Sequence, residues 1–324
     1  MKVLKFGGSS LATPERIRGV AAIVTRARHE ADVAVVVSAL GGVTDVLLGA
    51  AAAAREGEAW DAPCDALARR HAEAVTALAP ASEQEAVAAR VEAVLAELRD
   101  LLHGIQLLGE TSARALDGVA ACGERLSVEL VAAALRADGA DAEACDARRL
   151  ILTDSRFGEA RVEVEESYER IRRHFDEERP LQVVTGFIGE SDGRVTTTLG
   201  RGGSDYTACL LGAALGAEAV EIWTDVDGVM SADPRLVPSA VALPHLSYDE
   251  LMELSHFGAK VIHPPSVHPT RARSIPLVVR NTFRPEAPGT RITAEPSARS
   301  AARPVRAARK NPSRNTVAAN TARE

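Results

Sequence analysis

The run of residues most suited to binding or chemistry is TTTLGRGGSD at positions 196–205. It combines three threonine hydroxyls, three glycines, Arg201 and a Ser204–Asp205 pair, and it precedes a stretch of small helix-forming residues. Glycines let backbone N–H groups approach an anion, helix N-termini favour negative charge, and arginine binds carboxylates or phosphates through two parallel hydrogen bonds. Ser204 or Asp205 is expected to cap the following helix. A plain hairpin would need neither the arginine nor the hydroxyls, so we favour an anion site.

A second glycine motif, KFGGSS at positions 5–10, follows the first predicted strand. Its Lys5 supplies a positive charge, and Gly7 and Gly8 leave the backbone amides accessible to an anion. The spacing matches neither a Walker A loop nor GxGxxG. A strand followed by two glycines is also a common plain turn, so this motif alone leaves both interpretations open.

Three further segments carry polar side chains near predicted strands or helices. Residues 223–229 (WTDVDGV) directly follow a predicted buried strand, where open α/β sheets bind ligands, but they lack the closing glutamate of a calcium loop. Lys260 lies at a glycine-containing bend, where a lone lysine is usually solvated. Glu124 stands in an apolar helical context and is either paired or on the exposed face. The sequence shows no nucleophilic triad and no metal-ligand spacing such as HExxH.

Alternating strand and helix patterns predict an α/β protein that contains a helical insertion. The continuous apolar run DVAVVVS at 32–38 predicts a strand buried on both faces, as in a parallel sheet. Further strands are expected at 2–6, 142–145, 181–187, 219–224 and 276–280. Helices are expected from Thr13, with Pro14 at the first helical position, and near 43–55, 61–78, 84–108, 112–137, 163–177, 204–216, 247–257 and 264–273.

Composition and charge separate the body of the chain from its end. The 324 residues are 46% hydrophobic and 26% charged, which is typical of a soluble globular protein. Residues 294–324 carry seven basic and two acidic side chains, a net +5, so the overall charge of −7 leaves −12 on the rest. Such a body excludes an extended nucleic-acid surface. The tail lacks aromatic residues and nearly all branched aliphatic ones, so we expect it to be disordered.

Cysteine use and hydropathy indicate the compartment. Cys64, Cys122, Cys145 and Cys209 are scattered and form no CxxC pair. No segment is long and apolar enough to span a bilayer, and the N-terminus is too short and too charged for a signal-peptide core. We therefore expect free thiols and a cytoplasmic protein without membrane contact.

Taken together, the motifs resemble the amino acid kinase family, and within it the aspartate kinases. The resemblance covers nearly all of residues 1–293, and the opening is similar to the family's KFGGTS motif, with Ser9 in place of threonine. The helical region 43–138 matches an insertion that shorter relatives lack. The other matching motifs, in order, are Ser38 with the loop 41–44, Gly123-Glu124, Arg156–Gly158, Thr185–Gly189, Thr196–Asp205, Thr224–Gly228, Asp233–Arg235 and Phe257–Pro264.

The resemblance implies a three-layer α/β/α fold with a mainly parallel central sheet and a helical insertion at about 43–138. It implies one catalytic domain at 1–293, with an aspartate-binding N-terminal lobe and a nucleotide-binding C-terminal lobe from about 196. The implied reaction moves the γ-phosphoryl group of ATP, supplied with Mg²⁺, to the side-chain carboxylate of L-aspartate. The 4-phospho-L-aspartate formed is the first intermediate toward lysine, threonine and methionine. Because that carboxylate is ionised at pH 7, no general base is required.

The resemblance also assigns site residues. Lys5 would stabilise the transferring phosphoryl group and Asp205 would orient Lys5, so both are the expected catalytic residues. Glu124 would bind the α-ammonium of aspartate and Arg201 a carboxylate, and Ser38, Thr44, Phe187 and Ser204 would complete that pocket. The nucleotide site would comprise Lys5, Gly7, Gly8, Ser9, Thr224, Asp225, Met230, Arg235 and Lys260. No stacking on adenine is expected from Met230, where some relatives have an aromatic residue, and no residue is assigned as a metal ligand.

Alternatives to this interpretation come from other function classes. A different amino acid kinase would act on another carboxylate or a carbamate, but the helical insertion and Gly123-Glu124 argue against it. A non-catalytic paralogue serving as a binding subunit is disfavoured because Lys5 and Asp205 are both present. A nucleic-acid-binding tail is disfavoured because it lacks aromatic residues for stacking.

The family also raises the question of regulation and assembly. Most aspartate kinases continue into ACT domains that bind lysine or threonine and contribute to subunit contacts. The sequence ends where those domains would begin, so feedback control by that route is not predicted. The sequence leaves a homo-oligomer open.

Overall fold

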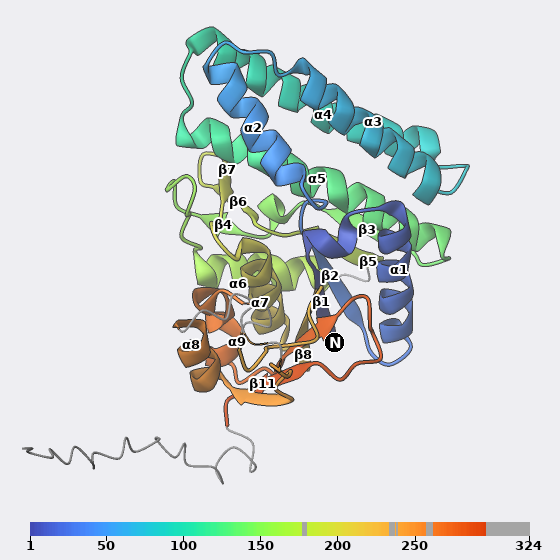
Figure 1. Cartoon of the computed structure of the whole chain (residues 1–324), viewed down its shortest axis with the longest axis vertical. Helices are drawn as coiled ribbons and strands as arrows, with labels where there is room; N and C mark the ends of the chain where they lie inside the picture. Colours follow the sequence, from blue (N-terminus) through green and yellow to red (C-terminus); the bar gives the residue numbers. More distant parts are fainter. Residues whose placement is uncertain (177–179, 233–236, 238, 257–261, 296–324) are drawn as a thin grey trace, which may run out of the picture.

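The computed structural model describes residues 1–176, 180–232, 237, 239–256 and 262–295 (Figure 1). Two residues expected in the nucleotide site, Arg235 and Lys260, lie outside the described residues, as do residues 296–324 of the basic tail.

A mainly parallel sheet forms the centre of the described chain. Its eight strands follow the order β3-β5-β2-β1-β8-β10-β11-β9, and only the neighbours β10 and β11 run antiparallel. The strands are Lys2–Phe6 (β1), Val33–Val37 (β2), Ala142–Cys145 (β3), Leu181–Thr185 (β5), Ala219–Thr224 (β8), His245–Ser247 (β9), Leu277–Asn281 (β10) and Thr290–Thr293 (β11). The predicted parallel sheet is confirmed, whereas the short strands β9 and β11 were not predicted.

The valine-rich strand β2 is buried on both faces, as its composition predicted. Val35 and Val37 belong to one hydrophobic core, which includes residues of α1 (Pro14–Arg28), while Ala34 and Val36 belong to a second core on the opposite face. Side chains alternate between the faces of a strand, so one run of valines contributes to both cores. Thr13 caps α1 as expected, since its side chain accepts a hydrogen bond from the Arg16 N–H.

The predicted insertion folds as four successive helices. They are α2 (Val43–Arg55), α3 (Asp61–Leu78), α4 (Gln84–Leu108) and α5 (Ala113–Ala137), with bounds that agree with the sequence-based ones to within a residue. Figure 1 shows α2, α3 and α4 stacked over α5. Buried residues recur every three or four positions, as with Val87, Val91 and Leu98 of α4, which is the spacing of one helical face.

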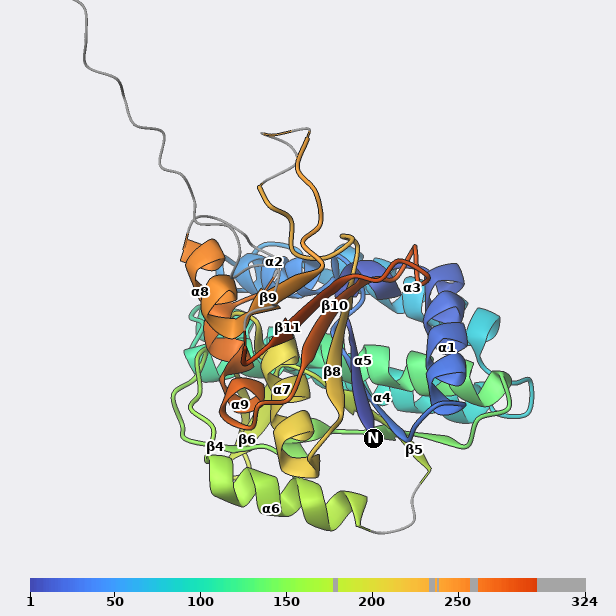
Figure 2. The same ribbon diagram turned by 90° about the horizontal axis from the view of Figure 1, so that it is seen from below.

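The remaining helices cover the other face of the sheet. They are α6 (Val164–Phe175), α7 (Gly203–Leu215), α8 (Tyr248–His256) and α9 (His268–Ala272), and short 3₁₀ turns lie at Gly8–Leu11, Ala147–Arg149 and Pro264–Val267. Figure 2 shows α1 on one side of the sheet and α7, α8 and α9 on the other. The three layers confirm the predicted fold class. The single helix expected at 264–273 is instead a 3₁₀ turn followed by α9.

A second, small sheet was not predicted. Its strands are Leu152–Thr153 (β4), Ile188–Ser191 (β6) and Thr196–Thr198 (β7), in the order β4-β6-β7. Figure 1 shows this sheet between α5 and α6. The strand expected at 181–187 ends at Thr185, and two residues later Phe187 has a φ of 69°, which takes the backbone out of the strand conformation.

The described cysteines and helices agree with the expectations drawn from composition. All four cysteines are buried and none forms a disulfide. Among the described residues, no helix combines the length and the apolar character required to cross a membrane.

The close packing of α7 on β8 gives a test of the fold. A Cβ on Gly212 would overlap the Cγ2 of Val220, whereas one on Gly49, in the exposed face of α2, would meet no atom within 4 Å. We expect Gly212→Ala to lower the free energy of unfolding by about 1–3 kcal/mol through overpacking. Gly49→Ala should raise it by about 0.5–1 kcal/mol, because alanine is the better helix former. Urea denaturation measures both, and equal shifts in the same direction would contradict this packing.

Candidate active site

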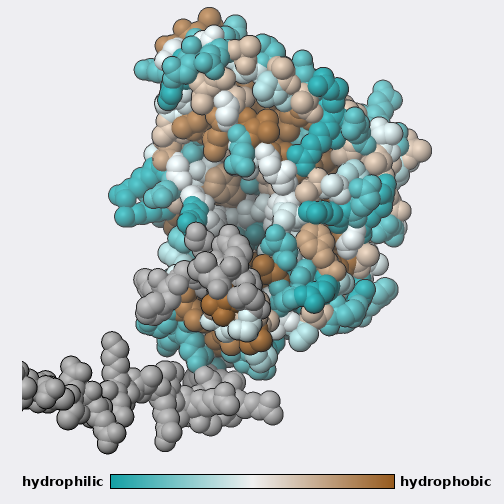
Figure 3. Space-filling model, viewed as in Figure 1, coloured by the Kyte–Doolittle hydropathy of each residue, from teal (hydrophilic) through white to brown (hydrophobic). Residues whose placement is uncertain are grey.

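A cleft of about 370 Å³ opens between the helices of the insertion and the carboxyl ends of the central strands. Figure 3 shows the hollow on this face of the molecule. Lys5 and Gly8 line it from β1 and the following loop, residues 38–42 with Thr44 and Asp45 from the end of β2 and the start of α2, and Glu124 from α5. Phe187 and the turn that leads into α7, with Gly200 and residues 202–205, complete the lining.

Lys5 and Asp205 form a largely buried ion pair in this cleft. The Lys5 Nζ lies 2.6 Å from the Asp205 Oδ1, and the two side chains are 12% and 10% exposed. The pairing of the strands fixes the position of Lys5. Strand β1 pairs with β2 on one side and with β8 on the other, which places Lys5 opposite Val36 and Ile222. Asp205 lies in the first turn of α7. The structure thus brings together the two residues predicted to be catalytic.

Two glycine loops meet backbone to backbone beside this pair. A Cβ on Gly8 would lie 2.9 Å from the Ala39 carbonyl oxygen, and one on Gly41 would lie 3.0 Å from the Gly8 carbonyl oxygen. Any larger residue would push the loops apart, so glycine is required by this close approach. Arg70 of α3 secures the contact, since it donates hydrogen bonds to the carbonyl oxygens of Ala12 and Gly41 at 2.9 and 3.1 Å.

Glu124 reaches the cleft from α5 and is 4% exposed. Its Oε1 accepts a hydrogen bond from the Ala39 N–H at 3.2 Å, while its Oε2 is buried without a hydrogen-bond partner among the described residues. Burial raises the pKa of Glu124 to about 8, an effect that the Ala39 N–H and the Lys5 charge only partly offset. The side chain is therefore neither on the exposed face nor fully paired, and its free oxygen can accept a hydrogen bond from a ligand.

The turn before α7 differs from the prediction in how the helix begins. The N-cap is Gly202, with a φ of 72° and no side-chain cap, and α7 starts at Gly203. The expectation that Ser204 or Asp205 caps this helix was wrong, because Gly202 is the residue that adopts the left-handed conformation of the turn. Ser204 and Asp205 follow Gly203 within the first turn of α7, where they line the cleft. Ser266 donates a hydrogen bond to the Gly202 carbonyl oxygen at 3.0 Å and supports the turn from behind.

Most residues predicted for the aspartate pocket line the same cleft. Ser38, Thr44, Glu124, Phe187 and Ser204 all do so. Arg201 is the exception, because its side chain is exposed and does not line the cleft, although its neighbours Gly200 and Gly202 do. No ion pair joins Arg201 to another described residue.

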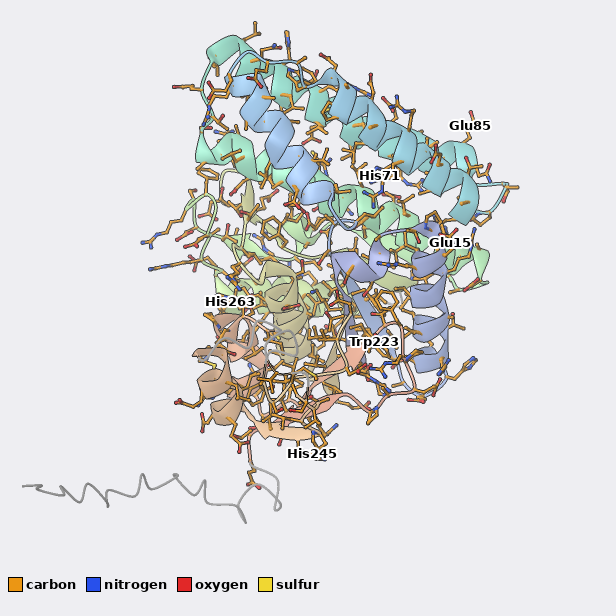
Figure 4. The ribbon with its side chains drawn as sticks, in the orientation of Figure 1. Glu15, His71, Glu85, Trp223, His245 and His263 are labelled. Carbon is orange, nitrogen blue, oxygen red and sulfur yellow. The ribbon has the colours of Figure 1, made fainter. Side chains whose placement is uncertain are left out.

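Of the residues predicted for the nucleotide site, Gly7, Gly8 and Ser9 follow β1, and Thr224 and Asp225 lie at the end of the neighbouring β8. Gly8 lines the cleft, and the Gly7 N–H donates to the Trp223 carbonyl oxygen at 3.2 Å, which joins the first glycine loop to the end of β8. Trp223, labelled in Figure 4, precedes Thr224 and the exposed Asp225, whose side chains are hydrogen-bonded to each other at 3.1 Å. Ser9 follows in a 3₁₀ turn, and Met230 forms an isolated bridge with Ala242. Ser9, Thr224, Asp225 and Met230 do not line the described cleft.

Sequence reasoning missed residues that shape the cleft from a distance in the chain. Asp45 lines it from the first turn of α2, next to the predicted Thr44. Arg70 supports the glycine loops, and Ser127 donates a hydrogen bond to the Ser38 carbonyl oxygen at 2.6 Å. Asp45 could have been noted from its place beside the glycine loop, whereas nothing local in the sequence marks Arg70 or Ser127.

The arrangement suits the transfer of a charged group between two anions. The cleft presents the backbone of three glycine segments, one ammonium group held by a carboxylate, and the buried carboxyl group of Glu124, which has one oxygen without a partner among the described residues. Accessible amides and an ammonium group stabilise phosphoryl oxygens, and a cation bound beside Glu124 would favour the ionised form of its carboxyl group.

Comparison with known proteins agrees with this geometry. The model of the amino acid kinase family matches residues 1–281. The chain is 37% identical over 295 residues to the bifunctional aspartokinase/homoserine dehydrogenase of Haemophilus influenzae, covering 90% of this chain and 36% of that protein. It is 38% identical to aspartokinase 3, chloroplastic, of Arabidopsis thaliana, of which it covers 52%.

A solved structure of E. coli aspartokinase III in complex with aspartate and ADP superposes with a TM-score of 0.84 at 33% identity, over 92% of this chain and 65% of that one. The complex of the same enzyme with lysine and aspartate gives a TM-score of 0.81. The chain thus spans between about a third and two thirds of the length of these relatives. It belongs to the amino acid kinase family.

Glu124 makes the stability of the fold depend on pH. Its pKa of about 8 in the fold lies above the ordinary value of 4.5, so between these values the folded protein keeps a proton that the unfolded chain releases. The Glu124 contribution to stability therefore falls as pH rises through this window. We expect the melting temperature of Glu124→Gln, relative to wild type, to increase from about pH 5 to about pH 9. Thermal unfolding of the ligand-free protein measures this difference.

The control is Glu85→Gln, which removes an exposed carboxylate from α4 and so corrects for the change in net charge. A difference between Glu124→Gln and wild type that is constant over the same pH range would contradict the pKa shift.

Proposed function

We propose that the chain catalyses ATP-dependent phosphorylation of the side-chain carboxylate of L-aspartate, giving 4-phospho-L-aspartate. The observation that carries this proposal is the free, buried oxygen of Glu124 in the same cleft as the Lys5–Asp205 pair. The relatives described above, aspartokinases of bacteria and plants, support the same substrate.

The reaction needs no general base, because the attacking carboxylate is already ionised at neutral pH. The described lining of the cleft accordingly contains no histidine. What the protein must supply is alignment of two anions, neutralisation of charge and exclusion of water.

Lys5 is proposed to stabilise the transferring phosphoryl group. In the structure its ammonium group is held by Asp205 at 2.6 Å, which fixes its direction before any substrate arrives. Gly8 and Ser9 would add backbone amides at the end of β1, whereas the Gly7 N–H already donates to the Trp223 carbonyl oxygen and so holds the glycine loop in place. Because the ammonium group is already oriented, little reorganisation is required when negative charge moves onto the phosphoryl oxygens.

The aspartate pocket is proposed to recognise two charged groups of the amino acid. Glu124 would accept a hydrogen bond from the α-ammonium, and Arg201 at the rim would bind a carboxylate. Ser38, Thr44, Phe187 and Ser204 would complete the pocket, which agrees with their place in the lining. An incoming ammonium group would also satisfy the Glu124 oxygen that has no partner, so binding relieves the cost of burying it.

The nucleotide is proposed to lie along the ends of β1 and β8, beside Thr224, Asp225 and Met230, with Arg235 and Lys260 on its phosphates. Among the described residues no group of three or more His, Cys, Asp or Glu side chains could hold a metal ion. Mg²⁺ supplied with ATP would be bound mainly by phosphate oxygens and water. The ion would neutralise phosphate charge, and Thr224 and Asp225 are among the described polar residues at that end of the sheet. The N-terminal lobe would thus bind aspartate and the lobe from about 196 the nucleotide.

The direct test is aspartate-dependent formation of ADP and of an acyl phosphate trapped as the hydroxamate. We expect Lys5→Met to lower kcat about a hundredfold or more, because it removes charge stabilisation in the transition state. The control is Lys2→Met, three residues earlier on the same strand, where the ammonium pairs with Glu30 at 2.8 Å, and kcat should stay near wild type. Circular dichroism confirms that both variants are folded. No aspartate-dependent product from the wild type would refute the proposed function.

A substrate panel separates this reaction from those of other amino acid kinases. Succinate keeps both carboxylates of aspartate but lacks the ammonium group that Glu124 would bind. We expect kcat/KM for succinate to be at least about tenfold lower than for aspartate, since a buried polar group is left without its partner. Glutamate and carbamate complete the panel. Preference for any of these over aspartate would favour a different member of the family.

A further inference from the structure

Asp117 of α5 is a buried carboxylate outside the cleft that gathers hydrogen bonds from two distant segments. It is 3% exposed. The Gly158 N–H donates to both of its oxygens at 3.0 Å, the Thr198 N–H donates to Oδ2 at 2.9 Å, and the Thr198 hydroxyl donates to Oδ1 at 2.8 Å. One side chain thus joins α5 to β7 and to the loop around Gly158.

Both partners of Asp117 lead directly to the cleft. Thr198 is the last residue of β7, and Gly200, two residues on, begins the turn that lines the cleft. The loop around Gly158 packs against the same turn, since a Cβ on Gly200 would lie 3.2 Å from the Gly158 carbonyl oxygen. The Leu199 N–H also donates to the carbonyl oxygen of Phe187, another residue of the lining, at 2.8 Å.

The helix that carries Asp117 also carries Glu124. Asp117 and Glu124 lie seven residues apart on α5, which is about two turns, or ~10.5 Å along the axis, and places them on similar sides of the helix. A single rigid helix therefore carries both a lining residue of the cleft and the anchor of the turn on its other side.

Asp117 does not stabilise the fold through its charge. Burial, the largest influence, raises the pKa of Asp117, and the hydrogen bonds from Gly158 and Thr198 offset only part of this effect. The ionised group thus costs the fold free energy at neutral pH. What it provides is geometry, because a carboxylate can accept from several donors at once and so fix three segments relative to one another.

We infer that Asp117 is a positioning residue that holds the turn at 199–203 against α5 and so sets the distance between Arg201 and Glu124. This inference rests on the proposed function, in which those two residues bind the α-ammonium and a carboxylate of aspartate. Loss of the connection would let the turn move relative to Glu124. Lys5 and the ends of β1 and β8 are held by their own pairing in the central sheet and not by Asp117, so the effect should fall mainly on the binding of aspartate.

The kinetic test compares variants of Asp117 with variants of its hydrogen-bond partner Thr198. Thr198→Val removes the hydroxyl donor with little change in shape, Thr198→Ser restores it, and Asp117→Asn replaces one accepting oxygen by an NH₂ group that faces the same donors. We expect Thr198→Val and Asp117→Asn to raise KM for aspartate about fivefold or more, with KM for ATP within twofold of wild type. Thr198→Ser should return KM for aspartate toward the wild-type value.

The matched control is Ser167→Ala. Ser167 is a fully buried residue of α6 whose hydroxyl bonds the Leu152 N–H and carbonyl oxygen at 3.0 and 3.3 Å, so it anchors the far strand of the same small sheet. We expect it to lower the melting temperature without changing either KM. If Thr198→Val and Asp117→Asn behave like Ser167→Ala, or raise both KM values equally, Asp117 is only structural and the inference is overturned.

A readout without turnover separates this inference from the proposed function. Hydrogen exchange of ligand-free Asp117→Asn should be faster than wild type in peptides covering 156–160 and 198–203, and unchanged in those covering 5–10 and 39–44. Suppose that this exchange pattern is found but the wild-type chain does not phosphorylate aspartate. Asp117 would then still anchor the turn, and only the proposed reaction would be refuted. Unchanged exchange in the first two peptides would overturn the positioning role whatever the activity.

Discussion

The ion pair between Lys5 and Asp205 is the constraint on which the cleft depends. An ammonium group with 12% of its side chain exposed is costly to bury unless a carboxylate lies close by. Lys5 is fixed by its neighbours in the central sheet and Asp205 by the first turn of α7, so the pair is satisfied only when α7 is correctly packed on β1. The same packing places the turn at 200–203 opposite the first glycine loop. The ion pair that the site needs therefore forms only when the helix α7 is packed on the sheet.

The helical insertion is part of the site and not an addition to it. From α5, Glu124 and Ser127 hold the backbone of Ala39 and Ser38, and Gly123 allows the close approach, because a Cβ there would lie 2.8 Å from the Cβ of Ala39. From α3, Arg70 holds the next residues of the same loop. The loop after β2 has little regular structure of its own, and its shape comes from these helices. A shorter chain without the insertion would have to support that loop in another way.

Most of the fold could be predicted because its signals are local. The valine run of β2, the Thr13-Pro14 helix start and the spacing of buried residues in α4 each determine an element within a few residues. Strands of two to four residues, such as β4 and β7, are too short to show a period, and they form only through long-range partners. The helix start at α7 was mistaken because a polar side chain was preferred over the left-handed Gly202. Much of the predicted aspartate pocket came together, but supports such as Arg70 and Asp117 could not be found, since their partners are distant in the sequence.

The meeting of Gly8 with Gly41 has a consequence for redesign. Along its glycine segments the cleft wall is main chain, so these parts offer no side chain that could be exchanged to admit a different substrate. Enlarging a glycine there displaces a whole loop and gives no graded change in shape. Along these segments, a change in shape would more readily come from the residues behind the wall, where Arg70, Ser127 and Ser266 hold the backbone by hydrogen bonds to its carbonyl oxygens. There the adjustable parts of the cleft lie beneath its surface.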